Sequence, residues 1–324
     1  MQQVILQQPG ELLLHDIAIP RPGEGEALVR IHRVGVCGTD MHAYHGRQPF
    51  LSYPRVLGHE LGVEIVEIGE NDRGLAVGDH CAVEPYITCG KCHSCSIGKT
   101  NCCENFQTLG VHTDGAMQPL FAVPIRLLHK SEKLSLDQLA LVETLGVGAH
   151  AVRRGKTQPG QDVLVVGAGP IGLAAIQYAH GLGANVRVLE LNERRRDFVA
   201  ALGVEVLSEP DDQLAEVVID ATGHPQAMEA SFERVAFGGT LVFVGFHKGD
   251  VKYHNPLFHR REMTVCGSRN SVGVIPTLIE MIEDGRIDTA PWITHRMLLT
   301  DVPDRFPKLS DDPSLVKAMI EVEG

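Results

Sequence analysis

The sequence lacks the features that define several classes of protein. It has 29 Lys and Arg against 41 Asp and Glu, which gives a net charge of −12, and its basic residues form no long cluster apart from Arg194-Arg195-Arg196. This balance argues against nucleic acid as a partner. No apolar run approaches the roughly 20 residues that cross a bilayer, and the first residues lack the basic start and apolar core of a signal peptide. We therefore expect a cytoplasmic protein with no membrane partner.

Repeats and low-complexity tracts are also absent, so the chain does not have the sequence signature of a solenoid or a disordered protein. The 324 residues, of which 44% are apolar and 22% charged, fit an ordinary globular protein of about two domains. Eight cysteines in a long chain without an export signal indicate thiols or metal ligands, not a disulfide framework.

Four of these cysteines lie close together in the chain, at Cys89, Cys92, Cys95 and Cys103. Four thiolates on one loop can surround a tetrahedral zinc ion and leave no position for water, which is typical of a structural site. Cys102 adjoins the last ligand, but Cys103 fits the spacing better. The alternatives are an iron–sulfur cluster, whose ligands also stand close in sequence, and a loop with cysteines unrelated to metal. We predict a structural zinc loop over residues 89–103.

A second group of metal-ligating residue types begins at Cys37 and ends with His59 and Glu60. A thiolate, an imidazole and a carboxylate suit zinc, and three protein ligands leave one coordination position open for chemistry. The alternative is that Cys37 only fills the core, as buried free cysteines often do. The surrounding chain, residues 1 to about 120, alternates apolar and polar residues in short runs such as Gly62–Gly69. This pattern predicts a β-rich barrel or sandwich whose loops carry the chemistry.

The second half changes to alternating strands and helices. A continuous apolar run, Asp162–Val166, leads into Gly167-Ala168-Gly169-Pro170-Ile171-Gly172, and a helical pattern follows over Leu173–Leu182. Val186–Leu189 is the next strand, and Glu190 stands at its end. A glycine turn between a buried strand and a helix, with an acidic residue after the next strand, predicts a dinucleotide-binding site. The alternative is a glycine-rich turn without a ligand.

The acidic residue also bears on the choice of cofactor. Glu190 would hydrogen-bond the ribose hydroxyls, which favours NAD over NADP, although Arg194 and Arg195 could contact a 2′-phosphate. Further strands at 204–207, 217–220, 241–245 and 264–267 complete a doubly wound parallel sheet, and the segment 208–216 is too short for a crossover helix. The candidate cofactor-binding residues are Gly167, Gly169, Pro170, Ile171, Gly172, Glu190, Arg195, Thr222, Gly245, Phe246, Ser268 and Arg269.

These motifs, in this order, resemble the zinc-containing medium-chain alcohol and polyol dehydrogenases. The resemblance covers essentially the whole chain and is greatest to the sorbitol, threonine and sugar-acid branch. Three stretches are similar to bacterial enzymes acting on L-galactonate-type sugar acids: Tyr44-His45-Gly46, Tyr53-Pro54-Arg55 and Leu57-Gly58-His59-Glu60. It implies an α/β protein with a GroES-like catalytic domain at residues 1–148 and 269–324 and a Rossmann domain at residues 149–268. It also implies a homodimer or homotetramer. Gly115-Ala116 departs from the family, in which many members have two glycines.

The resemblance also implies residue roles. Cys37 and His59 would bind the catalytic zinc, with either Glu60 or Glu143 as the carboxylate ligand. Asp40 would orient the His59 ring, because ligating imidazoles usually donate their other N–H to an acceptor. Thr39 and His42 would pass the substrate proton to solvent.

We therefore expect two zinc ions per chain and an NAD-dependent enzyme. It would oxidise a secondary hydroxyl of a polyol or sugar acid to a ketone by hydride transfer. The alternatives are a threonine-type amino-acid dehydrogenase, a zinc-free quinone or enone reductase, and a non-catalytic dinucleotide-binding protein.

Overall fold

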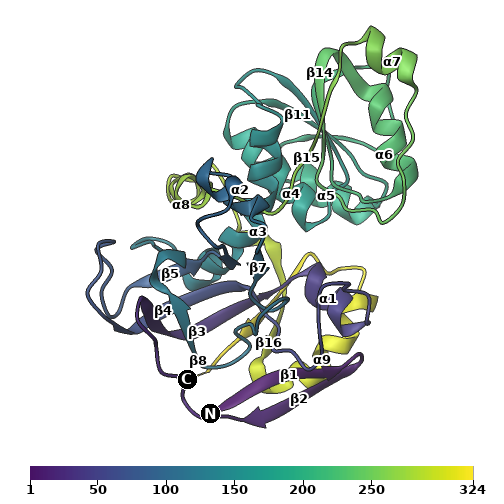
Figure 1. Cartoon of the computed structure of the whole chain (residues 1–324). Coiled ribbons are helices and arrows are strands. Elements are labelled where there is room, and N and C mark those ends of the chain that lie inside the picture. The colour runs from purple at the N-terminus through teal and green to yellow at the C-terminus, as the bar shows by residue number, and fades with distance from the viewer. Residues whose placement is uncertain (324) are drawn as a thin grey trace. The chain divides into compact units, whose positions relative to one another are not determined.

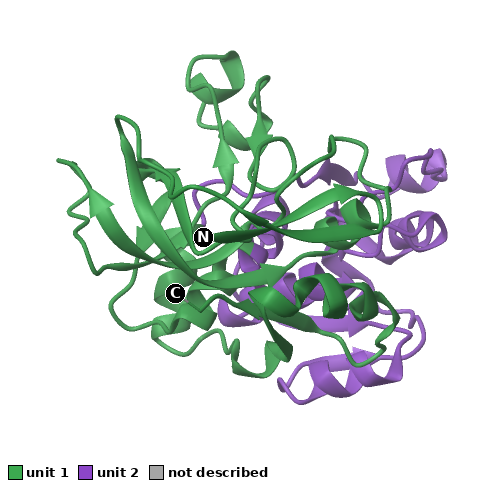
Figure 2. Cartoon of the chain, turned by 90° about the horizontal axis from the view of Figure 1, so that it is seen from below, with its two compact units in different colours: residues 1–143, 275–324 green, residues 144–274 purple. Residues whose placement is uncertain are grey.

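The computed structural model describes residues 1–323 and divides the chain into two compact units. Unit 1 comprises residues 1–143 and 275–324, and unit 2 comprises residues 144–274 (Figure 2). In the described part of the chain, no helix is both long and apolar enough to span a membrane.

Unit 1 is built mainly from antiparallel β-strands (Figure 1). Its strands are β1 (Gln2–Gln8), β2 (Glu11–Asp16), β3 (Glu26–Val36), β4 (Glu60–Ile68), β5 (His80–Val83), β6 (Tyr86–Ile87), β7 (Gln107–Thr108), β8 (Leu120–Pro124), β9 (Leu128–Lys130), β16 (Ile293–Leu298) and β17 (Lys317–Glu321). Its helices are α1 (Gly38–Tyr44), α2 (His93–Ser96), α8 (Ile275–Glu283) and α9 (Val302–Arg305).

A seven-stranded sheet in the order β16-β17-β3-β4-β5-β9, with β8 also paired to β3, forms the body of this unit. Alternate residues of its central strands, such as Ile31, Val63 and Ile65, are fully buried in one large apolar core. The strand β17 pairs antiparallel with β3, so this late segment of the chain belongs to the same sheet as the first strands of unit 1.

Unit 2 contains a six-stranded parallel sheet in the order β12-β11-β10-β13-β14-β15. Its strands are β10 (Asp162–Val166), β11 (Asn185–Leu189), β12 (Glu205–Leu207), β13 (Ala215–Asp220), β14 (Val235–Phe243) and β15 (Thr264–Gly267). Its helices are α4 (Pro170–Gly181), α5 (Glu193–Ala200), α6 (Pro225–Ser231) and α7 (Asn255–Arg260), and α3 (Leu136–Arg154) continues from unit 1 into unit 2.

The strand order places β10 at the centre, where the chain reverses its winding direction between β11 and β13. Val163, Leu164 and Val165 are almost fully buried, as expected for a strand covered on both faces. No helix lies between β12 and β13, as the short segment predicted. The predicted fold class, an α/β protein with a β-rich part and a doubly wound parallel sheet, is confirmed. The helix α3 and the strand β16 were not predicted from the sequence.

Candidate active site

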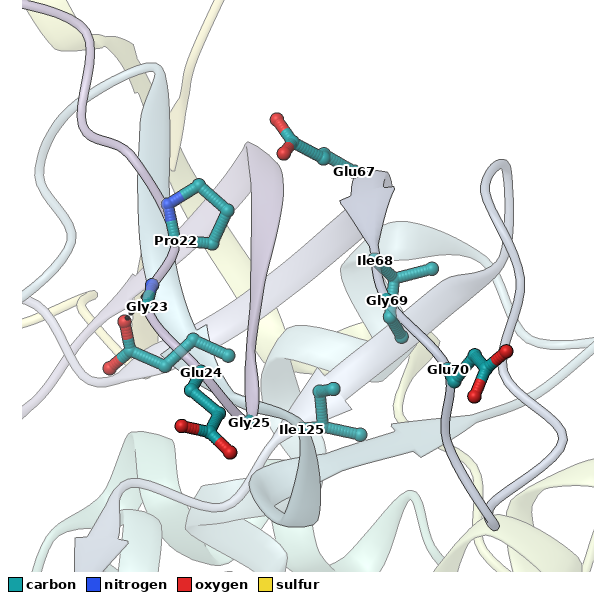
Figure 3. A pocket seen from close by; sticks show the side chains of 10 residues that line it. Pro22, Gly23, Glu24, Gly25, Glu67, Ile68, Gly69, Glu70 and Ile125 are labelled. Atoms are coloured by element: carbon teal, nitrogen blue, oxygen red, sulfur yellow. Dashed lines mark hydrogen bonds between the residues drawn. The ribbon is translucent and has the colours of Figure 1, made fainter.

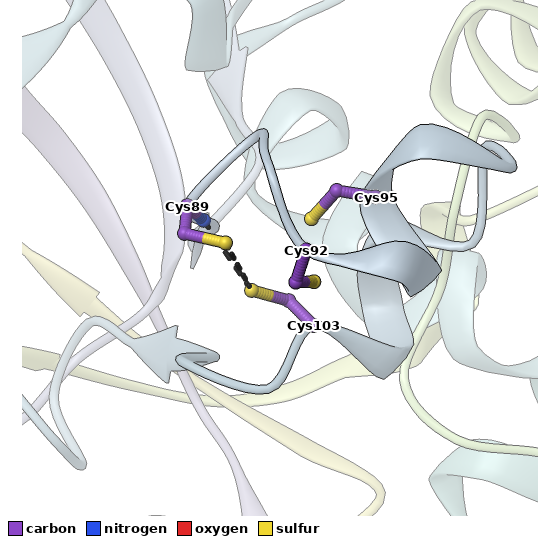
Figure 4. Close-up of side chains that lie close together, drawn as sticks. All are labelled: Cys89, Cys92, Cys95 and Cys103. Atoms are coloured by element: carbon purple, nitrogen blue, oxygen red, sulfur yellow. Dashed lines mark hydrogen bonds between the residues drawn. The ribbon is translucent and has the colours of Figure 1, made fainter.

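The four-cysteine loop starts from β6 and returns into β7, and these two short strands pair with each other. The Sγ atoms of Cys89, Cys92, Cys95 and Cys103 lie within 4.8 Å of one another (Figure 4). The backbone N–H groups of Cys89 and Asn105 both donate to Cys103 Sγ at 3.3 Å. Cys102 is exposed and is not part of this group.

The close spacing of these thiols fits a cation site. Backbone N–H groups of Lys91 and Cys92 lower the pKa of Cys89 to about 6, whereas burial and the neighbouring Cys92 raise the pKa of Cys95 to about 12. Thiols so close together resist joint ionisation unless a cation lies among them. Four sulfur donors at this spacing fit a tetrahedral zinc ion.

A second donor group lies at the junction of β3, α1 and β4. Cys37 is the residue directly before α1, His59 directly precedes β4, and Glu60 is the first residue of β4. Because β3 and β4 are antiparallel partners, with Gly35 opposite Glu60, the two ends of this motif meet. One donor atom from each of Cys37, His59 and Glu60 lies within 4.8 Å of the others. A Cβ on Gly35 would lie 2.1 Å from Glu60 Oε2, so only glycine leaves room for this carboxylate.

Asp40 is fully buried and accepts a hydrogen bond from the Cys37 N–H at 2.9 Å. Its other oxygen, Oδ1, lies 3.7 Å from His59 Nδ1, and neither atom has a hydrogen-bond partner. The predicted orientation of His59 by Asp40 is therefore an ion-pair contact at this distance, not a formed hydrogen bond. Burial lowers the pKa of His59, but Asp40, Cys37 and Glu143 together raise it well above its ordinary value. This cluster of negative charge around an imidazole fits a divalent cation.

Glu60 is paired with Lys317, which sequence reasoning missed. Lys317 Nζ donates to both carboxylate oxygens, at 2.6 Å and 2.8 Å, and to the Val36 carbonyl at 3.3 Å. Lys317 is 2% exposed and Glu60 is fully buried. The only local sign of this role is a lysine in the otherwise apolar run Leu315–Ile320.

Glu143, the second carboxylate considered for the metal, lies on α3 and is 6% exposed. Its Oε1 accepts a 2.5 Å hydrogen bond from the Tyr86 hydroxyl, and Tyr86 was not among the predicted site residues. Burial raises the pKa of Glu143, and its charge acts on His59, Glu60 and Lys317. Glu143 is not part of the group formed by Cys37, His59 and Glu60, whose donor atoms lie within 4.8 Å of one another, but its charge acts on that group.

The two residues of the predicted proton relay lie on α1. Thr39 is half-buried and His42 is exposed. Their roles stay predictions.

The glycine turn of unit 2 lies between β10 and α4. Gly167 has φ +91°, which favours glycine, and a Cβ on Gly172 would lie 1.9 Å from the Gly167 carbonyl oxygen. Gly169 stands directly before α4 and Pro170 occupies its first turn. A Cβ on Gly169 would meet no atom closer than Arg195 Nη1 at 4.0 Å. The N-terminus of α4 is therefore open, which suits a pyrophosphate.

Glu190 closes one side of this turn. Its Oε2 accepts a hydrogen bond from the Ala168 N–H at 2.7 Å, and its Oε1 accepts one from the Asn192 N–H at 2.8 Å. Arg195 Nη1 lies 4.0 Å from Glu190 Oε2, and the Arg195 side chain is 49% exposed. A carboxylate and a guanidinium thus border the turn together.

The loops after β13 and β14 pack on each other. A Cβ on Gly245 would lie 2.2 Å from the Gly223 nitrogen, and one on Gly223 would lie 2.7 Å from the Phe246 carbonyl oxygen. The hydroxyl and the backbone N–H of Thr222 both donate hydrogen bonds to Asp220 Oδ1, at 2.8 Å and 2.9 Å.

Phe246 is 73% exposed. Ser268 follows β15, its hydroxyl is buried without a hydrogen-bond partner, and Arg269 comes next. All these residues follow strand ends of the sheet, where α/β proteins bind ligands.

A cavity of about 340 Å³ in unit 1 is separate from these groups (Figure 3). None of the predicted site residues lines it. Its lining residues are Pro22, Gly23, Glu24, Gly25, Glu26, Glu67, Ile68, Gly69, Glu70 and Ile125.

Comparison with known proteins identifies the class. Residues 23–133 match the alcohol dehydrogenase GroES-like domain, and residues 170–284 match the zinc-binding dehydrogenase domain. The chain belongs to the zinc-type medium-chain alcohol dehydrogenase family and is a zinc-dependent, NAD-linked dehydrogenase of a small-molecule substrate.

Several individual proteins are similar to this chain over nearly its whole length. The chain is 40% identical to L-galactonate-5-dehydrogenase of Escherichia coli K12, over 99% of this chain and 98% of that protein. It is 34% identical to 2-dehydro-3-deoxy-L-galactonate 5-dehydrogenase of Pseudoalteromonas atlantica, over 93% and 92%. Among solved structures, the alcohol dehydrogenase rspB from E. coli CFT073, in complex with NADH, aligns with a TM-score of 0.93 at 28% identity, covering 99% of both chains.

Proposed function

We propose that this protein oxidises a secondary hydroxyl of a sugar acid of the L-galactonate type to a ketone, with NAD as the oxidant. The observation that carries the proposal is the donor group of half-buried Cys37 and buried His59 and Glu60, in a chain that is 40% identical to an L-galactonate-5-dehydrogenase.

The bound groups supply the reactivity: zinc polarises the substrate hydroxyl, and NAD accepts the hydride. The chain supplies position and charge. Cys37 and His59 hold the metal, and Glu60 or Glu143 provides the carboxylate. Lys317 offsets the charge of Glu60, so two carboxylates can border one buried site. Thr39 and His42 relay the proton of the substrate hydroxyl to solvent, for which the exposure of His42 is suitable.

Unit 2 serves as the dinucleotide-binding domain and unit 1 as the catalytic domain. The open N-terminus of α4 receives the pyrophosphate, with Gly167, Gly169, Pro170, Ile171 and Gly172 forming the turn. Glu190 binds the ribose hydroxyls and favours NAD over NADP, while Arg195 borders the same turn. The loops with Thr222, Gly245, Phe246, Ser268 and Arg269 contact the rest of the cofactor.

The assembly is a homodimer or a homotetramer, and its location is the cytoplasm. The feature that supports self-association is β15, an edge strand of the sheet on which Thr264 and Val265 are exposed. An open, apolar strand edge is a template for pairing with another chain. Light scattering coupled to gel filtration gives the number of chains.

The test is NADH formation with a panel of L-galactonate, other aldonates, polyols and threonine, together with the zinc content. We expect about two zinc ions per chain and the highest kcat/KM for an aldonate. Preference for threonine would identify an amino-acid dehydrogenase. If no compound of the panel gave NADH although two zinc ions were bound, the proposed substrate class would be contradicted.

A further inference from the structure

Tyr86 occupies a place that no motif accounts for, between the core of the four-cysteine loop and the carboxylate of Glu143. We propose that Tyr86 is a positioning residue for the catalytic metal: its hydroxyl fixes the carboxylate of Glu143, and its ring anchors that contact in the core of the four-cysteine loop. This inference rests on the proposed function, since it needs a metal ion at the Cys37–His59 site.

The first observation is the contact between the hydroxyl and the carboxylate. Tyr86 Oη donates to Glu143 Oε1 at 2.5 Å, and the two residues are 5% and 6% exposed. This length is at the short end of the range for an O–H donor on a carboxyl oxygen. In a buried site, where water does not compete, such a bond determines where the carboxylate lies.

The second observation is how the tyrosine ring is held. The Tyr86 and Phe106 rings pack with centroids 5.4 Å apart, and Cys103 completes this small buried cluster. The other three cysteines of the loop pack against the same cluster. Tyr86 is also paired with Thr108 across β6 and β7, the strands from which the loop leaves and to which it returns. The ring therefore cannot shift without disturbing the four-cysteine loop.

The third observation is that Glu143 acts on the metal-ligating residues. Its charge interacts with His59, Glu60 and Lys317, so a change in its position alters the field at the donor group. Residues that hold metal ligands or their neighbours in place typically contribute about 10- to 100-fold to metal affinity or activity. The contacts therefore run from the cysteine loop through Tyr86 to Glu143, whose charge acts on the donor group of the catalytic metal.

The test uses Tyr86→Phe, which removes one oxygen and keeps the ring that packs on Phe106. The matched control is Tyr53→Phe, which removes another tyrosine hydroxyl of unit 1, one that donates to the Ala43 carbonyl at 2.6 Å. The readout is the dissociation constant of each zinc ion, measured by competition with a chromophoric chelator on the full-length protein. The absorption spectrum of cobalt at the catalytic site gives a second readout that is independent of turnover.

A double-mutant cycle with Glu143→Met shows whether Tyr86 acts through Glu143. We expect Tyr86→Phe to weaken the catalytic zinc about 10-fold, to leave the four-cysteine zinc unchanged and to alter the cobalt spectrum. In the Glu143→Met background, Tyr86→Phe should alter the affinity for the catalytic zinc by less than about 2-fold, because the carboxylate that accepts the hydrogen bond is already absent. The control variant Tyr53→Phe should have the zinc affinities and the cobalt spectrum of the parent protein.

Three results would overturn the inference: parent-like affinity and spectrum in Tyr86→Phe, equal effects of the change with and without Glu143, or unfolding or loss of the four-cysteine zinc in Tyr86→Phe. The last would assign the hydroxyl to folding alone. Failure of the proposed function has a different signature, because the parent itself would then bind one zinc ion or form no NADH.

Discussion

The buried pair of Lys317 and Glu60 gives the most specific prediction for stability. Replacing Lys317 by Met keeps most of the side-chain volume and removes the ammonium group. Glu60, which is fully buried and accepts two hydrogen bonds from Lys317, would then be a buried carboxylate without its cation. Breaking a buried ion pair from one side costs about 3–5 kcal/mol, so we expect a decrease of that size in the free energy of unfolding of the zinc-free protein.

A second variant separates the effect of the unpaired carboxylate on stability from the effect of lost packing. The double variant Lys317→Met, Glu60→Gln removes both charges, and it should recover most of the stability, because the cost arises from the unpaired carboxylate. Zinc at the neighbouring donor group offers Glu60 another cation, so the loss in Lys317→Met should be smaller in the zinc-loaded protein.

The assay is urea unfolding followed by circular dichroism at neutral pH, with and without a chelator. Burial lowers the pKa of Lys317 but the charge of Glu60 raises it overall, so its contribution persists at neutral pH and is lost only as pH rises through the raised pKa. A decrease below about 1 kcal/mol in Lys317→Met, or a double variant no more stable than the single one, would refute the reasoning.

Three further predictions concern other parts of the chain. Asp137→Asn should cost about 1–2 kcal/mol in urea unfolding, because Asp137 accepts bonds from Arg33 at 2.7 Å and Arg296 at 2.5 Å. Despite partial burial, these arginines lower the pKa of Asp137, so its contribution is complete above about pH 4 and is lost as pH falls through the lowered pKa; an equal difference between parent and variant at pH 7 and pH 3 would contradict this. Cys81, whose pKa burial raises to about 12, should resist iodoacetamide at pH 8 while the exposed Cys102 reacts, as peptide mass spectrometry would show. Gly172→Ala should abolish NADH binding in fluorescence titration, since its Cβ would overlap the Gly167 carbonyl oxygen, and a parent-like dissociation constant would argue against this turn as the binding site.

Features encoded in short stretches of sequence were predictable. The strand Asp162–Val166 has the predicted bounds because an unbroken apolar run before a glycine turn has few other solutions. The grouping of the four cysteines followed from their spacing alone, since a short loop limits how far apart the thiols can lie.

Features that depend on contacts distant in sequence were not predictable. Lys317 meets Glu60, and Tyr86 meets Glu143, only because the sheet of unit 1 and α3 bring these segments together. The helix α3 itself was missed because its residues 139–152 are nearly all buried, so it has no polar face and no helical period in hydrophobicity. The choice between Glu60 and Glu143 also could not be made from sequence, because the place of each carboxylate depends on contacts between segments distant in the chain.

The most direct test of the proposed function combines zinc content and NADH formation from L-galactonate in the parent and in Cys37→Ser. We predict about two zinc ions per chain and NADH formation in the parent, and about one zinc ion and at least a 100-fold lower rate in the variant, with NADH binding retained. Two tightly bound zinc ions or a parent-like rate in Cys37→Ser would contradict a catalytic metal held by Cys37.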